Sequence, residues 1–432
     1  MNAAPKRFVV AMLGARMHYA VPRLLNKADA LEHFYTDFSA ANDWPRLFSF
    51  IPERLRSGTA RRLLSRIPEG MPAKRITAFN LFGCEYALRR AGAKGPTRRT
   101  QTFLWANERF CKLVANADWG QATGVFTFNC AGLEILRRAK STGLRTVVEQ
   151  CIAPSRIEQR LLAGERDLHP GWEAAPSDDL REAYSHREED EWPLADVIIC
   201  GSHFVRDGLK QCGGPAEKAV VVPYGVDAPM AEVPVRKKER SDSPLRVLTV
   251  GAVGLRKGAP YVLEAAGRLQ SKAQFRWVGA IDLLPRAAGE LRKYVELTGA
   301  VPSNEIVEHF QWADVFLLPS ICEGSATAVY EALSWGLPVI CTPNTGSVVR
   351  HDQDGFIVPI RSALAIQESL ARIASSPELL SAFSQNAREH SRRFTVEAYA
   401  QNLLKAVNEI PPGTKTPNGS NGSECASPQT EA

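Results

Sequence analysis

The chain has 432 residues, which is enough for two domains that each bury a core of their own. A hydrophobic fraction of 44% and a charged fraction of 23% are typical of a soluble α/β protein, and no apolar run approaches the roughly 20 residues that span a bilayer. The nine cysteines have no Cys-x-x-Cys spacing, so we expect reduced core thiols rather than disulfides or a zinc site.

The first predicted strand covers residues 6–13. Its apolar run is short and leads into Gly14 without a cleavage-type site, which argues against a signal peptide. In an open α/β sheet the turn after such a strand faces the ligand crevice, and Gly14 is the strongest candidate there, with Arg16 and His18 as weaker ones. The turn lacks the Gly-x-Gly-x-x-Gly pattern, which argues against a dinucleotide site.

Basic residues gather in the next part of the chain, and the net charge is +6. Residues 51–100 hold twelve Arg or Lys against three Glu, with Leu, Ile and Phe between them, a pattern that predicts basic amphipathic helices. The simplest interpretation is a solvated helical face. Docking on an anionic membrane surface is the main alternative, and nucleic acid is a more distant one because the chain shows no recognised binding module.

Three further strands are predicted before the middle of the chain, at 124–128, 145–149 and 195–200, and a fourth at 219–224. Residues 154–192 are expected to be helical. The polar, Pro-punctuated residues 228–244 predict a linker.

A second α/β unit is predicted to start with a strand at 245–251 and a helix from about Pro260. The glycine-rich loop between them carries Arg256 and Lys257. Such a loop is either a plain basic turn or a diphosphate site, since Arg offers a fork of donors and Lys a point charge.

Residues 318–346 read as strand, loop, helix and strand. We expect the helix to start near Ser325 or Thr327, where a hydroxyl can cap it. Glu323 precedes this helix and Glu331 lies about two turns on, so the two carboxylates do not share a face. The first N–H groups of the helix lie between them and can seat an anion. Two carboxylates on either side of an anion-binding site suit a nucleotide sugar, which has hydroxyls on its sugar, a diphosphate, and hydroxyls on its ribose. Two glutamates eight positions apart also arise by chance, however.

The context of these glutamates resembles the two-glutamate signature of the retaining family-4 glycosyltransferases (group 1 glycosyltransferases) of GT-B fold. The residues that carry the resemblance are Pro319-Ser320, Glu323-Gly324, Glu331-Ala332-Leu333 and Gly336-Leu337-Pro338-Val339. The resemblance implies an α/β fold with two doubly wound Rossmann-like domains facing a central cleft, and a C-terminal helix that crosses back to the first domain.

The resemblance also implies roles for particular residues. Glu323 would hold the hydroxyls of the transferred sugar, while Lys257 and Arg256 would neutralise the leaving diphosphate; these are the expected catalytic residues. The expected donor-binding residues are Gly14 (which borders the site from the acceptor side), Gly254, Gly324, Ser325, Ala326, Thr327 and Glu331. No metal and no cofactor are expected, because no Asp-x-Asp pattern lies near these residues.

Two positions depart from the family pattern. Many members place a His directly after the strand at 145–149, where this chain has Gln150. The family commonly has an Arg after the first Gly of the loop at 251–258, where this chain has Ala252, and Arg256 is the expected substitute.

The implied domains are 1–227 on the acceptor side, the linker 228–244, the nucleotide-sugar-binding domain 245–393, a crossover helix 394–410 and a disordered tail 411–432. The implied function is transfer of a hexosyl group from a UDP- or GDP-sugar to a hydroxyl of a growing lipid-linked or surface polysaccharide. The alternatives are a sugar-nucleotide epimerase of the same fold and a non-catalytic nucleotide-sugar-binding scaffold. The expected location is cytoplasmic, or alternatively peripheral on the inner face of the membrane. The expected partners are the nucleotide sugar and a glycan or lipid-linked acceptor, with an anionic membrane surface as the alternative noted above, and no nucleic acid.

Overall fold

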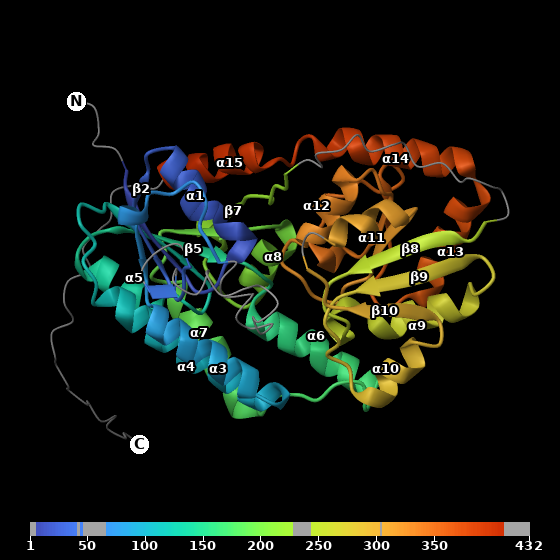
Figure 1. Ribbon diagram of the computed structural model, residues 1–432, viewed down its shortest axis with the longest axis horizontal. Helices are drawn as coiled ribbons and strands as arrows, with labels where there is room; N and C mark the ends of the chain where they lie inside the picture. Colours follow the sequence, from blue (N-terminus) through green and yellow to red (C-terminus); the bar gives the residue numbers. More distant parts are fainter. Residues whose placement is uncertain (1–5, 41–43, 46–65, 228–242, 303–304, 410–432) are drawn as a thin grey trace, which may run out of the picture.

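The computed structural model describes residues 6–40, 44–45, 66–227, 243–302 and 305–409. Two parallel sheets lie at opposite ends of an elongated molecule, and each is flanked by helices (Figure 1). In the described part of the chain, no helix combines the length and the apolar character needed to cross a bilayer. All eight cysteines that the structure describes are free thiols, and six of them are buried.

The first sheet has seven strands in the order β3-β2-β1-β4-β5-β6-β7, with every pairing parallel. Its strands are β1 (Phe8–Met12), β2 (Leu31–Thr36), β3 (Ile76–Ala78), β4 (Gly124–Phe128), β5 (Arg145–Gln150), β6 (Val197–Cys200) and β7 (Ala219–Val221). Strand β1 is buried along its whole length, because alternate side chains enter the hydrophobic clusters on the two faces: Phe8 and Val10 on one, Val9 and Ala11 on the other.

The helices of this first domain cover both faces of its sheet (Figure 1). Those in the described residues are η1 (Arg16–Tyr19), α1 (Ala20–Lys27), η4 (Ala73–Arg75), α3 (Asn80–Gly92), α4 (Gly95–Ala115), α5 (Leu133–Ser141), α6 (Ser155–Leu168), α7 (Asp178–Glu191), α8 (His203–Gln211) and η5 (Ala216–Lys218).

The second sheet has six strands in the order β10-β9-β8-β11-β12-β13, again all parallel. They are β8 (Leu245–Val250), β9 (Ala273–Val278), β10 (Val295–Gly299), β11 (Val315–Leu318), β12 (Val339–Cys341) and β13 (Gly355–Ile357). The helices are η6 (Leu255–Lys257), α9 (Ala259–Arg268), α10 (Pro285–Leu291), α11 (Ile306–Trp312), α12 (Thr327–Ser334), η7 (Pro343–Thr345), α13 (Ala363–Ser375) and α14 (Pro377–Ser391).

The direction of strand order reverses between β8 and β11 of this second domain. In doubly wound sheets such a reversal opens a crevice at the carboxyl ends of the two strands, and ligands bind there. The loops that follow these strands are 251–254 and 319–326. The second-domain residues predicted for the site lie in these loops or in the helices η6 and α12 that follow them.

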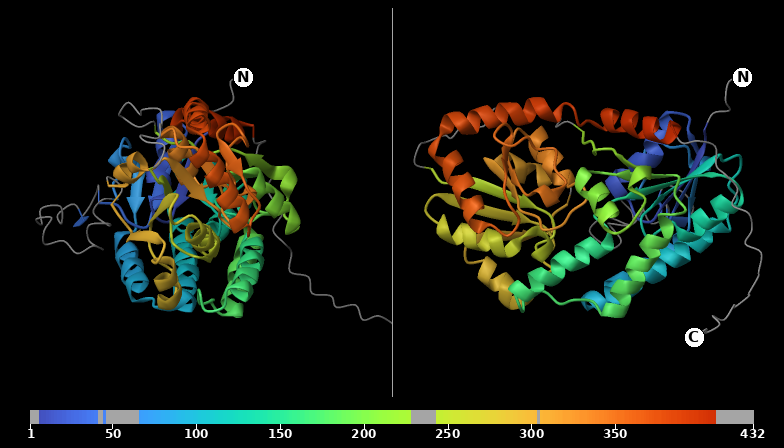
Figure 2. Two further views of the ribbon diagram at one scale, coloured as in Figure 1. Left: turned by 90° about the vertical axis from the view of Figure 1, so that its right-hand side faces the viewer. Right: turned by 180° about the vertical axis from the view of Figure 1, so that it is seen from behind.

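The last helix, α15 (Val396–Asn408), returns to the first domain and lies beside α1, and α14 and α15 run in succession along one side of both domains (Figure 2). Its residues Tyr399, Leu403 and Val407 are buried in the cluster that also holds Phe8. The two-domain doubly wound fold and the crossover helix are thereby confirmed.

Helix α6 belongs to the first domain by sequence but extends toward the second (Figure 1). Its fully buried Glu165 accepts hydrogen bonds from the Tyr261 hydroxyl at 2.9 Å and from Nε of Arg361 at 2.5 Å. Both donors belong to the second domain, so this buried carboxylate ties the two domains together.

The expectation that residues 51–100 form basic amphipathic helices is wrong for residues 76–78. These residues form β3, an edge strand paired with β2, before α3 begins at Asn80. The arginines of residues 54–62, most of the expected linker and the expected tail lie outside the described residues.

Candidate active site

A cavity of about 450 Å³ lies between the domains at the carboxyl ends of β8 and β11. We call it the interdomain cavity. The first domain lines it with Arg16, Met17, Cys151, Ile152 and Tyr224, and the second with Val250, Gly251, Arg256, Lys257, Glu323, Gly324, Ser325, Ala326, Thr327, Ala328 and Glu331.

Two cations converge on one carboxylate at the centre of this lining. Nζ of Lys257 and a terminal guanidinium nitrogen of Arg256 each lie 2.7 Å from Oε1 of Glu323. Burial disfavours the charged carboxylate, but the two cations outweigh it and lower the pKa of Glu323. Burial also lowers the pKa of Lys257, against the opposing effect of Glu323. Nε of Arg256 also lies 3.9 Å from a carboxylate oxygen of Glu158, so the two cations of the cluster face two carboxylates.

Close backbone contacts fix the two loops that carry these side chains. The N–H of Ile321 donates to the carbonyl of Arg256 at 2.8 Å. Gly258, with φ of +78°, approaches the carbonyl of Pro319 so closely that a Cβ would lie 2.3 Å from the oxygen. Only glycine fits this position without displacing the loop, which is why a glycine follows Lys257.

Helix α12 begins at Thr327, but the expected hydroxyl cap is wrong. Ala326 is the N-cap residue, and no side chain caps the helix. The hydroxyl of Ser325 instead pairs with the Tyr330 hydroxyl at 2.6 Å, and the N–H of Ala326 donates to the carbonyl of Thr345 at 3.3 Å. Thr327 and Ala328 line the cavity at the positive end of the helix.

Glu331 lines the same cavity as Glu323 but differs in its electrostatics. It is partly buried, and burial raises its pKa with no compensating cation. The two predicted carboxylates therefore face one ligand space, one neutralised by cations and the other available to hydroxyl donors.

Among the first-domain residues that line the interdomain cavity, Arg16 makes contacts with two of the others. Its guanidinium donates to the carbonyl of Cys151 at 3.2 Å and to the Tyr224 hydroxyl at 3.1 Å. Tyr224 in turn donates to the buried Glu149 at 2.8 Å, and Nε of Arg16 lies 3.7 Å from the same carboxylate oxygen. Sequence reasoning gave Arg16 little weight and missed Cys151 and Tyr224. The turn after the strand at 219–221 was the one available signal for Tyr224.

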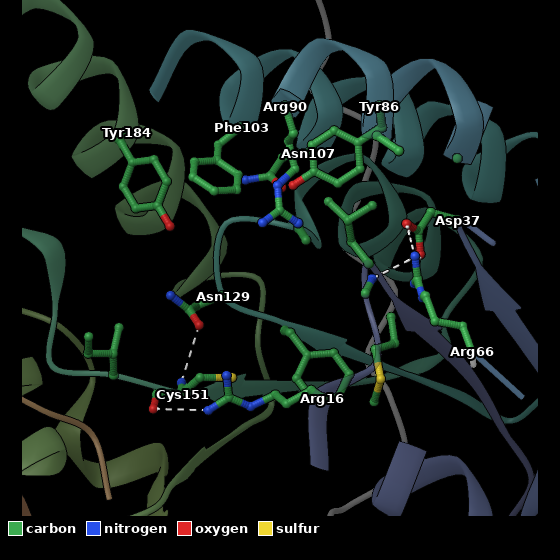
Figure 3. Close-up of a pocket in the computed structure, with 18 of the residues that line it drawn as sticks. Arg16, Asp37, Arg66, Tyr86, Arg90, Phe103, Asn107, Asn129, Cys151 and Tyr184 are labelled. Atoms are coloured by element: carbon green, nitrogen blue, oxygen red, sulfur yellow. Dashed lines mark hydrogen bonds and ion pairs between the residues drawn. The ribbon is translucent and has the colours of Figure 1, made fainter. Parts of the chain in front are cut away.

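A larger cavity of about 690 Å³ lies within the first domain, and we call it the first-domain cavity (Figure 3). It shares Arg16, Cys151 and Ile152 with the interdomain cavity, so the two spaces meet at these residues. Gly14, with φ of +97°, lines the first-domain cavity and donates its N–H to Asp37 at 2.9 Å.

Other candidates lie away from the interdomain cavity. Gly254 is not among its described lining residues; its carbonyl accepts the N–H of Lys257 at 3.2 Å, and it packs against Glu173. His18 is exposed. Gln150 is buried and donates to Glu188 at 2.7 Å, so the next residue, Cys151, is the one that reaches both cavities.

Comparison with known proteins gives matches to both sequence and fold. Residues 234–390 match the family described as glycosyl transferases group 1. The amylovoran biosynthesis glycosyltransferase AmsK of Erwinia amylovora is 28% identical over 229 residues, which cover 48% of this chain and 56% of that protein. The chain spans about half the length of the curated relatives it matches.

Two solved structures share the fold over almost the whole chain. Sucrose-phosphate synthase from Thermosynechococcus elongatus has a TM-score of 0.60 at 17% identity and covers 94% of this chain and 99% of its own. Anabaena HepE in complex with UDP-glucose has a TM-score of 0.58 at 13% identity and covers 94% and 100%.

Proposed function

We propose that the protein is a retaining, metal-independent hexosyltransferase. The proposal starts from the match of residues 234–390 to the group 1 glycosyl transferases and from the GT-B fold. The donor of this protein would be a UDP- or GDP-sugar held in the interdomain cavity. The observation that supports this most directly is the convergence of Lys257 and Arg256 on Glu323 beside the N-terminus of α12.

Each group has a separate task in this proposal. Glu323 accepts hydrogen bonds from hydroxyls of the transferred sugar, and Glu331 accepts them from the ribose. Lys257, Arg256 and the N-terminus of α12 stabilise charge that grows on the diphosphate as it leaves. Fixed charges of this kind act most strongly in the transition state, because they need no reorganisation as the charge develops.

In the transfer step, the bond between the anomeric carbon and the diphosphate oxygen breaks, and a bond from the acceptor oxygen forms on the same face. The acceptor proton passes to the departing diphosphate oxygen. The products are the glycoside with retained configuration and the nucleoside diphosphate, and no step calls for a metal.

We place the acceptor in a growing lipid-linked or surface polysaccharide. The relative AmsK is named for amylovoran biosynthesis, which supports a polysaccharide acceptor. Helix α3 favours docking on an anionic membrane surface, because two of its leucines could contact lipid. Leu81 and Leu88 are 79% and 73% exposed and lie two turns apart on one face of the helix. Flotation with anionic liposomes at low salt tests this, and absence of binding rejects the membrane part.

The donor test measures thermal shift and product formation with UDP-, GDP- and ADP-sugars, with and without EDTA. Glu323→Ala and Lys257→Ala are compared with the unaltered protein. A ligand that binds only the folded state raises the melting temperature. We therefore expect one nucleotide class to raise the melting temperature, and both variants to weaken this shift. We also expect sugar transfer to continue in the presence of EDTA. Anomeric configuration of the product, read by NMR, tests retention.

The same experiment tests the alternatives. An epimerase would convert the donor sugar without any acceptor, and a scaffold would bind nucleotide without turnover. Neither is favoured, since the matched curated relatives are named as glycosyltransferases.

A further inference from the structure

We propose that the first-domain cavity selects an acceptor with a negative charge beside its sugar ring, and that Arg90 and Arg16 recognise this charge. The inference rests on the proposed function, because it names the chemical class of the acceptor.

The charge balance of the cavity is its first support. Three guanidinium groups line it, from Arg16, Arg66 and Arg90, and Asp37 is the one carboxylate among the described lining residues. Asp37 is held by Arg66 through two hydrogen bonds, one of 2.8 Å from NH1 to Oδ2 and a second from NH2 to Oδ1. This fork-to-fork pair neutralises Asp37. Among the described lining residues, no other carboxylate is left to pair with Arg90 or Arg16, although Glu149 lies behind Arg16 at 3.7 Å from its Nε.

Arg90 projects into the cavity from α3 (Figure 3). The residues of α3 that line it are spaced as one helical face: Gly83, Tyr86, Ala87, Arg90 and Ala91. The Arg90 guanidinium lies 5.7 Å from the ring centre of Tyr86 and 5.8 Å from that of Phe103. Arg90 also makes a side-chain hydrogen bond with Tyr86. A guanidinium has five N–H donors, so further donors remain for an incoming anion.

Arg16 lies across the opposite side of the cavity, beside Cys151 (Figure 3). Its contacts with the Cys151 carbonyl, Tyr224 and Glu149 fix it where the two cavities meet. An anion held between Arg90 and Arg16 would therefore bring the attached sugar ring to the boundary with the donor.

The remaining walls suit a sugar ring. Aromatic side chains of Tyr86, Phe103, Phe128 and Tyr184 line the cavity together with the amide of Asn107. The Asn129 amide also lines it, but it already donates to Glu188 and accepts from the Cys151 N–H. Aromatic faces pack against the C–H groups of a sugar ring. An amide donates hydrogen bonds to sugar hydroxyls through its NH₂ group and accepts them through its oxygen. The volume of about 690 Å³ leaves room for a short saccharide with a charged group.

A negative charge beside a sugar ring can have two sources. One is the carboxylate of an acidic sugar, and the other is the diphosphate that links a saccharide to a lipid. Two matched probe pairs distinguish them. The first pair is methyl β-glucuronide and methyl β-glucoside, and the second is geranyl-diphospho-glucose and geranyl glucoside. Dissociation constants are measured by ligand-observed NMR on the full chain in the presence of UDP or GDP.

The test variant is Arg90→Gln, and the matched control is Arg89→Gln. Arg89 is the next residue on the same helix, but it pairs with Glu85 at 2.8 Å, stacks on Trp105 at 4.0 Å and is not among the described lining residues. The charged member of at least one pair should bind about tenfold more tightly, as expected for a charge-assisted hydrogen bond. Arg90→Gln should reduce this preference to about twofold or less, while Arg89→Gln should leave it unchanged.

Preference within the glucuronide pair assigns the carboxylate, and preference within the geranyl pair assigns the diphosphate. Equal binding within both pairs, binding to no charged probe, or equal loss in the two variants overturns the proposal. Thermal shift by UDP and GDP is measured on the same samples. Failure of nucleotide binding would count against the proposed function, whereas intact nucleotide binding without an anion preference would count against this inference alone.

Discussion

Nζ of Lys257 lies 2.7 Å from Oε1 of Glu323, and both side chains are about nine-tenths buried. A buried pair of this kind costs desolvation energy on both sides, and it is retained only where the geometry is good and further contacts satisfy the charges. Arg256 supplies such a contact to the same oxygen. The charged cluster is therefore assembled before any donor arrives, which is what stabilisation of a transition state requires.

Replacing Lys257 with Ala should lower kcat by about 10²- to 10³-fold, because a fixed charge near the leaving diphosphate is lost. Initial rates with the best donor of the screen measure this. Lys272→Ala serves as the control, since Lys272 is exposed and follows α9 away from both cavities. Equal rates for Lys257→Ala and the unaltered protein would remove Lys257 from the catalytic proposal.

The two glutamates of the interdomain cavity should show opposite pH effects on stability. The folded-state pKa of Glu323 is lowered, so its charge stabilises the fold above its ordinary pKa of 4.5, and this stability is lost as pH falls through the lowered value. Glu323→Gln should thus cost about 3 kcal/mol at pH 7, as expected when one partner of a buried ion pair is removed, and less in acid.

For Glu331 the sign is reversed. Burial raises its pKa, so the charged form costs stability at neutral pH, and this cost disappears as pH falls through the raised value toward 4.5. Glu331→Gln should therefore be more stable than the unaltered protein at pH 7, with the difference closing in acid. Urea unfolding at a series of pH values measures both variants, and a Glu331→Gln variant less stable at pH 7 contradicts the assignment.

The fold was largely predictable because buried parallel strands read as short apolar runs, as β1, β8 and β11 do. Strand β2 was missed because Glu32 and His33 interrupt its apolar pattern. Strand β3 has three residues at the edge of the sheet, and so short a segment carries little periodicity.

Lys257, Glu323 and Glu331 line one cavity, and the sequence pointed to them because the segments that carry them resemble the family signature. Arg16 gains its meaning from contacts with Cys151 and Tyr224, which are 135 and 208 positions away in the chain. Local spacing carries no signal for such contacts. The pairing of Ser325 with Tyr330 in place of a helix cap likewise depends on tertiary packing.

Loss of the buried charge of Glu165 should loosen the two domains. Glu165→Gln removes the anion that Arg361 and Tyr261 contact from the second domain, at an expected cost of about 3 kcal/mol. Glu264→Gln is the control, because Glu264 forms an exposed pair with Arg268, and such pairs contribute about 0–1 kcal/mol. Hydrogen exchange should rise in α6 and around Tyr261 in Glu165→Gln alone. Unchanged exchange would mean that α6 does not couple the domains.

Gly324 of the second domain packs directly against the backbone of Cys151 in the first domain, beside the site. A Cβ at this position would lie 2.0 Å from the carbonyl oxygen of Cys151, and the Gly324 carbonyl accepts a hydrogen bond from Ser202 at 2.5 Å. Because the obstructing atoms are backbone, Gly324→Ala can be accommodated only if the domains separate. We expect a cost of about 1–3 kcal/mol and a fall in kcat of about 10²-fold, since Glu323 moves with its neighbour.

Gly289→Ala is the matched control for this substitution. Gly289 lies on α10 with nothing within 4 Å of a built Cβ, so Ala there should stabilise the helix by about 0.5–1 kcal/mol. Nucleotide binding should survive Gly324→Ala, because the second domain supplies most of the lining of the interdomain cavity. Lost turnover with retained nucleotide binding would show that closure of Gly324 onto Cys151 aligns the donor with the acceptor. Full turnover in Gly324→Ala would show that the reaction proceeds without this contact.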